Sequence, residues 1–286
     1  MQPFSPDLDA QIRQVIRACG QQAEALSKQA FQVSEKGPED YVTSVDRVLD
    51  AQLSIAFGEM FAQDGIVTEE NIQSRQAFYQ NYERLWLIDP LDGTEDFIHG
   101  RSGYAVMVGS LEKARPTAGW IYAPAQDCMF YGGADWGLFQ TIADRPPQTL
   151  QPIAPPPLTE TCCPVILGDR DQANFGQIIL QQIPEIQLYS LGSFGLKVIE
   201  LILGRAGLYV YLNRRVKLWD TTAPLALAQV AGLVCCDLAG QPLSFQPDAI
   251  DPDTLAHKQP ILIGWSNYME ALRPRIAAAI ADQFVE

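Results

Sequence analysis

The chain lacks the runs and residues that mark membrane, secreted and zinc-binding proteins. No apolar run approaches the ~20 residues needed to cross a bilayer, and the first residues lack the basic segment and apolar core of a signal peptide. There are only two histidines and no C-x-x-C pair, so the six cysteines are expected to be buried free thiols rather than zinc ligands or disulfides. These absences predict a soluble protein of the cytoplasm.

Basic side chains are also scarce, since 20 Lys and Arg stand against 34 Asp and Glu, for a formal net charge of −14. This balance argues against a nucleic-acid polymer as partner, because phosphate backbones are bound by basic surfaces. It still allows a small phosphate ester, since a bound metal ion inverts the local charge. With 286 residues, of which 47% are hydrophobic, the chain can form one large or two modest domains.

Hydrophobic periodicity predicts an α/β protein. Ser5 is expected to cap the first helix, with Pro6 as its first residue. The expected helices cover 6–26, 46–60 and 194–203. The expected strands cover 104–111, 119–122, 129–131, 165–167 and 208–212, with turns at Pro124 and Gly132-Gly133. The proline-dense stretch 146–157 predicts a boundary between a domain of residues 1–150 and a domain of residues 151–286, and the second of these carries Asp220.

The most informative segment is Trp86-Leu87-Ile88-Asp89-Pro90-Leu91-Asp92-Gly93-Thr94. Its apolar start reads as the end of a buried strand, and Pro90 and Gly93 predict an immediate bend. Such a bend lets four oxygen donors face one point, namely the Asp89 and Asp92 carboxylates, the Leu91 carbonyl and the Thr94 hydroxyl. Oxygen donors suit Mg²⁺ or Mn²⁺ rather than zinc. The alternative is an ordinary Asx-type turn, in which Asp-Gly merely closes a loop.

Three further segments carry acids in equally specific settings. They are Gly65-Ile66-Val67-Thr68-Glu69-Glu70, Trp219-Asp220-Thr221-Thr222-Ala223-Pro224 and Asp40-Tyr41-Val42-Thr43-Ser44-Val45-Asp46. In order and spacing, the four segments resemble those of the inositol monophosphatase superfamily of metal-dependent, lithium-sensitive phosphatases. The resemblance spans residues 40 to 224, and it implies the layered α-β-α-β-α sandwich of that superfamily, with the site between the halves.

The resemblance also implies a metal ligand set. Glu69, Asp89 and the Leu91 carbonyl would bind a first Mg²⁺, and Asp89, Asp92 and Asp220 would bind a second. Two such ions support phosphoryl transfer to water. Mn²⁺ is an alternative metal, and a third ion remains open, near Asp46 and Lys36.

Catalytic roles follow from the same resemblance. The Thr94 hydroxyl, oriented by Asp46, would guide the proton off the attacking water. The backbone N–H groups of Gly93 and Thr94 would hold phosphate oxygens at the start of a helix near Glu95.

Several of these residues have simpler interpretations. Asp46 and Asp220 could each be a helix N-cap, the latter for a helix over 223–231. Lys36 could be a lone surface lysine and Glu70 a solvated neighbour of Glu69. The roles of Glu95, Asp96 and His99 stay open beyond a surface or structural one, and His257 is taken as structural.

Two departures from the inositol enzymes concern the substrate. Asn213 stands where those enzymes usually carry a glutamate for the hydroxyls of inositol. The tail Asp220-Thr221-Thr222-Ala223-Pro224 and the segment Gly192-Ser193-Phe194-Gly195-Leu196-Lys197 are instead similar to motifs of 3′(2′),5′-bisphosphate nucleotidases. Against this, Glu95 stands where many nucleotidases have lysine.

The sequence therefore predicts a small phosphorylated metabolite as partner, with 3′-phosphoadenosine 5′-phosphate as the favoured substrate. Arg214, Arg215 and Lys217 would supply basic side chains for its second phosphate, and Lys197 and Asn213 are expected as further substrate contacts. The simpler interpretation is that residues 213–217 form a solvated turn. The alternatives are an inositol monophosphate or another sugar phosphate, and, in a different class, a catalytically silent metal- or phosphate-binding regulatory module. The sequence leaves monomer and homodimer open, and it indicates no membrane partner.

Overall fold

The computed structural model describes residues 4–37, 40–158 and 163–281, and the chain forms two compact units. The first unit runs to Leu150 and includes Gly192–Leu196 and Leu218–Val230. The second unit holds Gln151–Leu191, Lys197–Lys217 and the chain from Ala231 onward. The chain thus leaves the first unit inside the proline-dense stretch. Asp220, however, belongs to the first unit, which differs from the predicted division into two consecutive halves.

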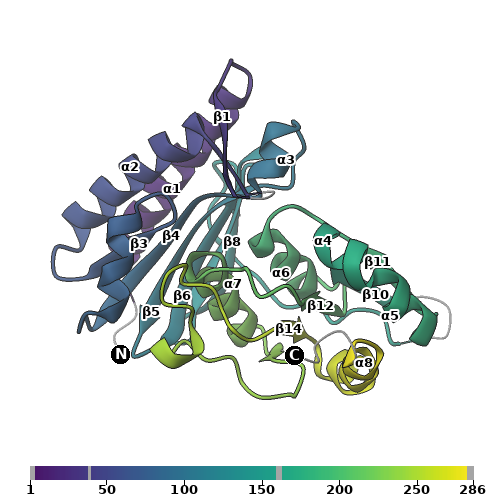
Figure 1. Ribbon diagram of the computed structural model, residues 1–286. Coiled ribbons are helices and arrows are strands. Elements are labelled where there is room, and N and C mark those ends of the chain that lie inside the picture. The colour runs from purple at the N-terminus through teal and green to yellow at the C-terminus, as the bar shows by residue number, and fades with distance from the viewer. Residues whose placement is uncertain (1–3, 38–39, 159–162, 282–286) are drawn as a thin grey trace. The chain divides into compact units, whose positions relative to one another are not determined.

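A seven-stranded sheet forms the centre of the first unit, in the order β3-β4-β5-β6-β7-β8-β9 (Figure 1). Its strands are β3 (Gly65–Thr68), β4 (Arg84–Asp92), β5 (Ala105–Glu112), β6 (Arg115–Ala123), β7 (Cys128–Gly133), β8 (Gly137–Ile142) and β9 (Gln148–Thr149). Only β3 and β4 pair in parallel. Strands β5 to β7 confirm the three strands expected there, but the turn expected at Gly132-Gly133 is wrong, because both glycines pair with β6 and β8.

Helices α1 (Pro6–Ser27) and α2 (Ser44–Met60) lie along one face of this sheet (Figure 1). As expected, Ser5 caps α1, and its side chain accepts a hydrogen bond from the Leu8 N–H at 3.2 Å. The helices bury their apolar stripes against Trp86 and Trp120 of the sheet, whose rings are 5.9 Å apart. A short hairpin, β1 (Val33–Gly37) and β2 (Asp40–Thr43), leads into α2.

Helix α7 (Leu218–Val230) packs on the opposite face. Side chains alternate along a strand, so Gly119 points away from the face to which Trp120 points. Gly119 pairs with Gly109 of β5, and a Cβ at either glycine would meet atoms of Ala223 in α7. The two missing side chains let the backbone of α7 approach the sheet, and this packing explains why a segment late in the chain belongs to the first unit.

Gly119→Ala is expected to destabilise the protein by ~1–3 kcal/mol, because the added methyl group would overpack the contact between α7 and the sheet. Gly58→Ala in α2 is the matched control, since its Cβ would have only Ile66 nearby, at 3.9 Å. That change should stabilise the helix by up to ~1 kcal/mol. Urea unfolding measures both, and equal midpoints for Gly119→Ala and the wild type would contradict this packing.

The second unit contains a five-stranded sheet in the order β11-β10-β12-β14-β13. Its strands are β10 (Cys163–Leu167), β11 (Ile186–Tyr189), β12 (Leu208–Tyr211), β13 (Val234–Cys236) and β14 (Ile261–Gly264). Strand β10 is parallel to both neighbours, whereas β14 is antiparallel to β12 and β13. The expected strands at 165–167 and 208–212 are confirmed as β10 and β12.

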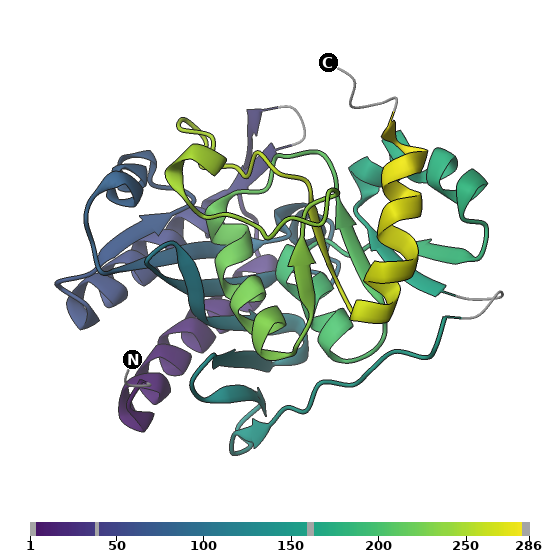
Figure 2. The ribbon, with the colours of Figure 1, turned by 90° about the horizontal axis from the view of Figure 1, so that it is seen from below.

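Helices of the second unit cover this sheet. Its core joins β10 and β12 to α5 (Gln177–Gln182) and α8 (Ser266–Ala279), which is drawn in yellow beside the strands in Figure 2. Helix α6 (Phe194–Ile202) confirms the helix expected at 194–203. The short helix α4 (Asp169–Asp171) follows β10.

The described part of the chain contains no helix that is both long and apolar enough to span a membrane. Four of the five described cysteines are buried, as expected. Cys162 lies outside the described residues.

Candidate metal centre

The pairing of β4 with β5 corrects the bend predicted after Ile88. β4 continues to Asp92, with Asp89 opposite Met107 and Asp92 opposite Ala105. The step from Asp89 to Asp92 is three residues, whereas the step from Met107 to Ala105 is two. Side chains three residues apart on a regular strand face opposite sides. The extra residue, a bulge-type irregularity, therefore turns Asp89 and Asp92 to the same side.

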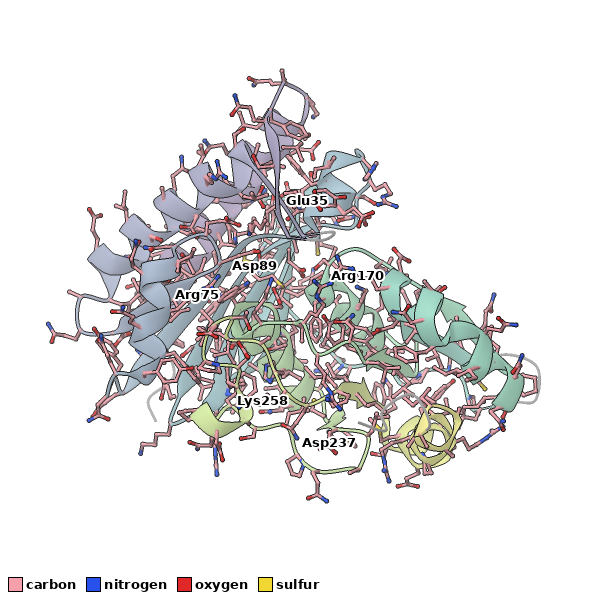
Figure 3. The ribbon with its side chains drawn as sticks, viewed as in Figure 1. Glu35, Arg75, Asp89, Arg170, Asp237 and Lys258 are labelled. Carbon is pink, nitrogen blue, oxygen red and sulfur yellow. The ribbon has the colours of Figure 1, made fainter. Side chains whose placement is uncertain are left out.

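Three aspartates meet at this irregularity. Asp89, Asp92 and Asp220 each offer a carboxylate oxygen within 4.8 Å of the others, with Asp220 in the first turn of α7 (Figure 3 labels Asp89). No other trio of potential metal-binding side chains with this spacing was found among the described residues. The set offers only oxygen donors, and Mg²⁺ and Mn²⁺ prefer such donors.

The electrostatics of the cluster favour a bound cation. Asp89 is 1% exposed, and burial, followed by the charges of Glu69, Asp92 and Asp220, raises its pKa well above the usual value. Crowded and buried carboxylates are unfavourable unless a positive charge compensates them. A divalent ion supplies that charge, so the residues fit the metal that the sequence predicts.

Glu69 approaches the cluster from the end of β3, and its partner is Lys36 of β1. The Lys36 Nζ lies 2.8 Å from Glu69 Oε1 and 2.5 Å from Glu70 Oε1. Burial lowers the pKa of Lys36, but the two carboxylates outweigh burial, and the net pKa is raised. The interpretations of Lys36 as a lone surface lysine and of Glu70 as a solvated neighbour are therefore wrong. Burial and the charge of Glu69 raise the pKa of Glu70 to about 7.

Thr94 and Asp46 lie next to each other beside this cluster. The Thr94 hydroxyl is 3.2 Å from Asp46 Oδ1 and 3.0 Å from the Leu91 carbonyl oxygen. Gly93, with φ +90°, precedes the short helix α3 (Thr94–Ile98), which begins at Thr94. The left-handed backbone conformation of Gly93 favours glycine. A Cβ at this position would also meet the backbone of neighbouring segments.

Asp46 is buried, and burial raises its pKa to about 6. Its carboxylate accepts a hydrogen bond from the Thr43 N–H at 2.9 Å, which closes a capping box at the start of α2. The N-cap of α2 is therefore Thr43, and Asp46 is the N3 residue that completes the box. The N-cap interpretation of Asp220 is likewise wrong, because α7 begins at Leu218.

Two residues that hold Asp92 were not predicted as parts of the metal centre. The Ser193 hydroxyl and the Gly195 N–H both donate hydrogen bonds to Asp92 Oδ2, the latter at 2.9 Å. Ser193 Oγ also accepts from the Leu196 N–H at 3.1 Å, at the start of α6. A serine just before a predicted helix is a signal for a capping side chain, and Ser193 precedes the helix expected at 194–203. That signal indicates a cap but not a contact with Asp92.

Asp96 helps to hold the segment that carries Ser193. It is buried, accepts a hydrogen bond from the Gly192 N–H at 3.1 Å and pairs with Arg101 at 2.8 Å. Asp96 therefore ties the segment that carries Ser193 to α3. Glu95, by contrast, is exposed and 3.6 Å from Arg101.

Ser193→Ala is expected to weaken Mg²⁺ binding by about 10-fold, because partners that orient a metal ligand are typically worth 10- to 100-fold in affinity. Isothermal titration with Mg²⁺ measures the change. Ser190→Ala is the control, since its hydroxyl bonds only to a neighbouring carbonyl, that of Leu191. Equal Mg²⁺ affinities for Ser193→Ala and the wild type would show that Ser193 does not orient Asp92.

The predicted substrate contacts Lys197, Asn213, Arg214 and Arg215 belong to the second unit, and their roles stay predictions. Lys197 is 7% exposed, with its Nζ 5.6 Å from the centre of the Tyr209 ring. Neither histidine belongs to the three-aspartate cluster. His99 Nδ1 is 2.8 Å from the Glu95 carbonyl oxygen. His257 is buried, and burial lowers its pKa to about 4.

Comparisons with known proteins identify relatives of the chain. A model of the inositol monophosphatase family matches residues 6–281. The 3′(2′),5′-bisphosphate nucleotidase CysQ of Escherichia coli (strain K12) is 33% identical over 168 residues, which span 59% of this chain and 65% of that protein. Inositol monophosphatase 1 of Bos taurus is 24% identical over 243 residues, 84% of each chain.

A solved structure shows the likeness in three dimensions. An IMPase of Thermotoga maritima matches with a TM-score of 0.76 at 20% identity, covering 97% of this chain and 99% of that one. This likeness confirms the layered α/β fold that the sequence motifs predict. Because the family model matches nearly the whole length, the chain belongs to the inositol monophosphatase family.

Proposed function

We propose that this protein is a Mg²⁺-dependent phosphomonoesterase that hydrolyses a small phosphorylated metabolite. The observation that carries the proposal is the meeting of Asp89, Asp92 and Asp220 within 4.8 Å, beside the Thr94–Asp46 pair. When bound, divalent ions activate water and offset charge on the phosphate oxygens. Mn²⁺ would serve as a substitute, and Li⁺ and Ca²⁺ would inhibit.

The chain's own residues perform the remaining tasks. Asp89, Asp92 and Asp220 would hold one ion, and Glu69, Asp89 and the Leu91 carbonyl would hold another. The Thr94 hydroxyl donates toward Asp46, which leaves an oxygen lone pair to accept the proton of the attacking water. The N–H groups of Gly93 and Thr94, at the start of α3, would bind phosphate oxygens.

The substrate that we propose is a 3′(2′),5′-bisphosphate nucleotide such as 3′-phosphoadenosine 5′-phosphate, which would lose its 3′ or 2′ phosphate. The support is the 33% identity to the Escherichia coli nucleotidase, together with the exposed Arg214 and Arg215, which suit a second phosphate. Inositol 1-phosphate or another sugar phosphate is the second candidate, favoured by the longer match to the Bos taurus enzyme. Asn213, in place of a glutamate, speaks against inositol.

The substrate proposal is tested by measuring kcat/KM on 3′-phosphoadenosine 5′-phosphate and on inositol 1-phosphate with the same preparation. We expect the nucleotide to be preferred at least tenfold, which corresponds to about 1.4 kcal/mol of transition-state discrimination. A tenfold preference for the inositol ester would instead support the second candidate. Complete inactivity on a broad panel of phosphomonoesters at high Mg²⁺ would favour a silent binding module.

A further inference from the structure

The second unit has a topological switch point at β10. Strands β10, β11 and β12 run parallel, with β11 on one side of β10 and β12 on the other. In open α/β sheets, ligands bind beyond the carboxyl ends of the strands at such a point. The segments that leave β10 and β12 there are 168–171 and 212–215.

Asp171 joins these two segments. Its side chain is fully buried, and its Oδ2 accepts a hydrogen bond from the Leu212 N–H at 2.8 Å. Burial raises the pKa of Asp171, and the hydrogen bonds from Leu212 and the Asn213 side chain, with the charges of Lys197 and Arg170, oppose that rise. These groups oppose burial without outweighing it, so the net pKa of Asp171 is raised.

The Asn213 side chain is used within the turn that follows β12. Its Oδ1 accepts a hydrogen bond from the Arg215 N–H at 3.1 Å, as in an Asx turn. Arg214, between them, has φ +56°, a left-handed conformation that is uncommon for a residue other than glycine. Such a conformation persists when the surrounding structure fixes it, and here Asp171 and Asn213 fix it from either side.

We propose that Asp171 is a positioning residue, which fixes the turn 212–215 so that Arg214 and Arg215 form the subsite for a second, non-reacting phosphate of the substrate. Both arginines are exposed, and a guanidinium can hold a phosphate through two hydrogen bonds. Asn213 is then a residue that shapes the turn and not a ligand of a substrate hydroxyl. The inference rests on the proposed function for the identity of the substrate.

Two substrates that differ only in the second phosphate test the proposal, 3′-phosphoadenosine 5′-phosphate and adenosine 3′-phosphate. Asp171→Ala should raise KM for the bisphosphate at least tenfold, with kcat and the values for adenosine 3′-phosphate changed less than twofold. Arg214→Ala with Arg215→Ala should have the same effect, and adding Asp171→Ala should raise KM no further, because both changes act through one subsite. Asp169→Asn, at an exposed position of α4 two residues before Asp171, is the control and should change nothing.

Asn213→Ala is a second test that does not depend on the folding of a buried variant. It should raise KM for the bisphosphate alone, because the turn loses the acceptor that the Arg215 N–H bonds. A rise of KM for both substrates would make Asn213 a ligand of a hydroxyl that both share, and would overturn the proposal. An Asp171→Ala effect that adds to that of the arginine variants would also overturn it.

Amide hydrogen exchange separates this inference from the proposed function. In Asn213→Ala, exchange in residues 212–215 should rise at least tenfold while β10 and the first unit keep wild-type protection. Unchanged exchange would contradict the positioning role.

If the wild-type protein hydrolyses no phosphomonoester, the proposed function fails. Calorimetric titration with the same two nucleotides then decides the inference, which requires tighter binding of the bisphosphate and loss of that preference in Arg214→Ala with Arg215→Ala.

Discussion

Asp89→Asn is expected to lower kcat/KM by about 10³-fold or more. Asp89 lies at the centre of the carboxylate cluster, where it faces Asp92 and Asp220 and where the charge of Glu69 also reaches it. The change keeps the shape of the side chain but removes a charge from the ligand proposed to bridge two ions. Positioning by two metals fails when either ion is lost. Steady-state kinetics across a range of Mg²⁺ concentrations measures the effect.

The unfolding of metal-free protein provides the control for this variant. Because Asp89 is buried with its pKa raised, its charged form destabilises the folded state near neutral pH. Asp89→Asn removes that charge, so the metal-free variant should unfold at a higher temperature than metal-free wild type. Added Mg²⁺ should stabilise the wild type and have little effect on the variant. Wild-type turnover in Asp89→Asn would remove Asp89 from the metal centre.

Thr94→Ala is expected to lower kcat by ~10²- to 10⁴-fold, the range in which positioned proton transfer contributes. Mg²⁺ affinity should stay within a few fold, because the Thr94 hydroxyl is not one of the proposed ligands. Thr94→Ser keeps the hydroxyl near Asp46 and should recover most of the rate. Single-turnover kinetics with Mg²⁺ titration separates rate from binding. An unchanged kcat would assign proton guidance to another group, and a large loss of Mg²⁺ affinity would make Thr94 a ligand.

The sequence predicted the acids of the site because they lie in short motifs, where neighbouring residues fix local geometry. It could not predict the irregularity in β4, which depends on the pairing of Asp89 and Asp92 with β5. Pro90 and Gly93 read locally as a bend, but hydrogen bonding to a neighbouring strand extended β4 through Pro90. Long-range pairing thus overrode a turn signal.

The division of the chain into two units also depends on long-range contacts that the sequence does not reveal. The proline-dense stretch marks where the chain leaves the first unit, but the return of α7 depends on Gly109 and Gly119, more than a hundred residues earlier. Nothing near Asp220 in the sequence indicates that contact. The roles of Ser193 and Asp171 were missed for a related reason, since each acts through a hydrogen bond to a residue distant in the chain.

Helix starts were ambiguous because an aspartate suits both a cap and a metal ligand. At α2 the threonine at position 43 takes the cap and leaves Asp46 Oδ1 to face Thr94. At α7 the helix begins two residues before Asp220, where the buried Leu218 and Trp219 extend its apolar face. In both helices the aspartate lies inside the first turn, near the positive end of the helix dipole.

The proposed Mg²⁺-dependent hydrolysis is tested most directly by the initial rate of phosphate release from 3′-phosphoadenosine 5′-phosphate, first in excess chelator and then with Mg²⁺ restored. Because the proposed chemistry depends on bound Mg²⁺, we expect no release above background in chelator and full recovery with Mg²⁺. We also expect Asp89→Asn to stay inactive under both conditions. Full activity in chelator, or recovery of Asp89→Asn by Mg²⁺ to the wild-type rate, would contradict the proposed Mg²⁺ dependence.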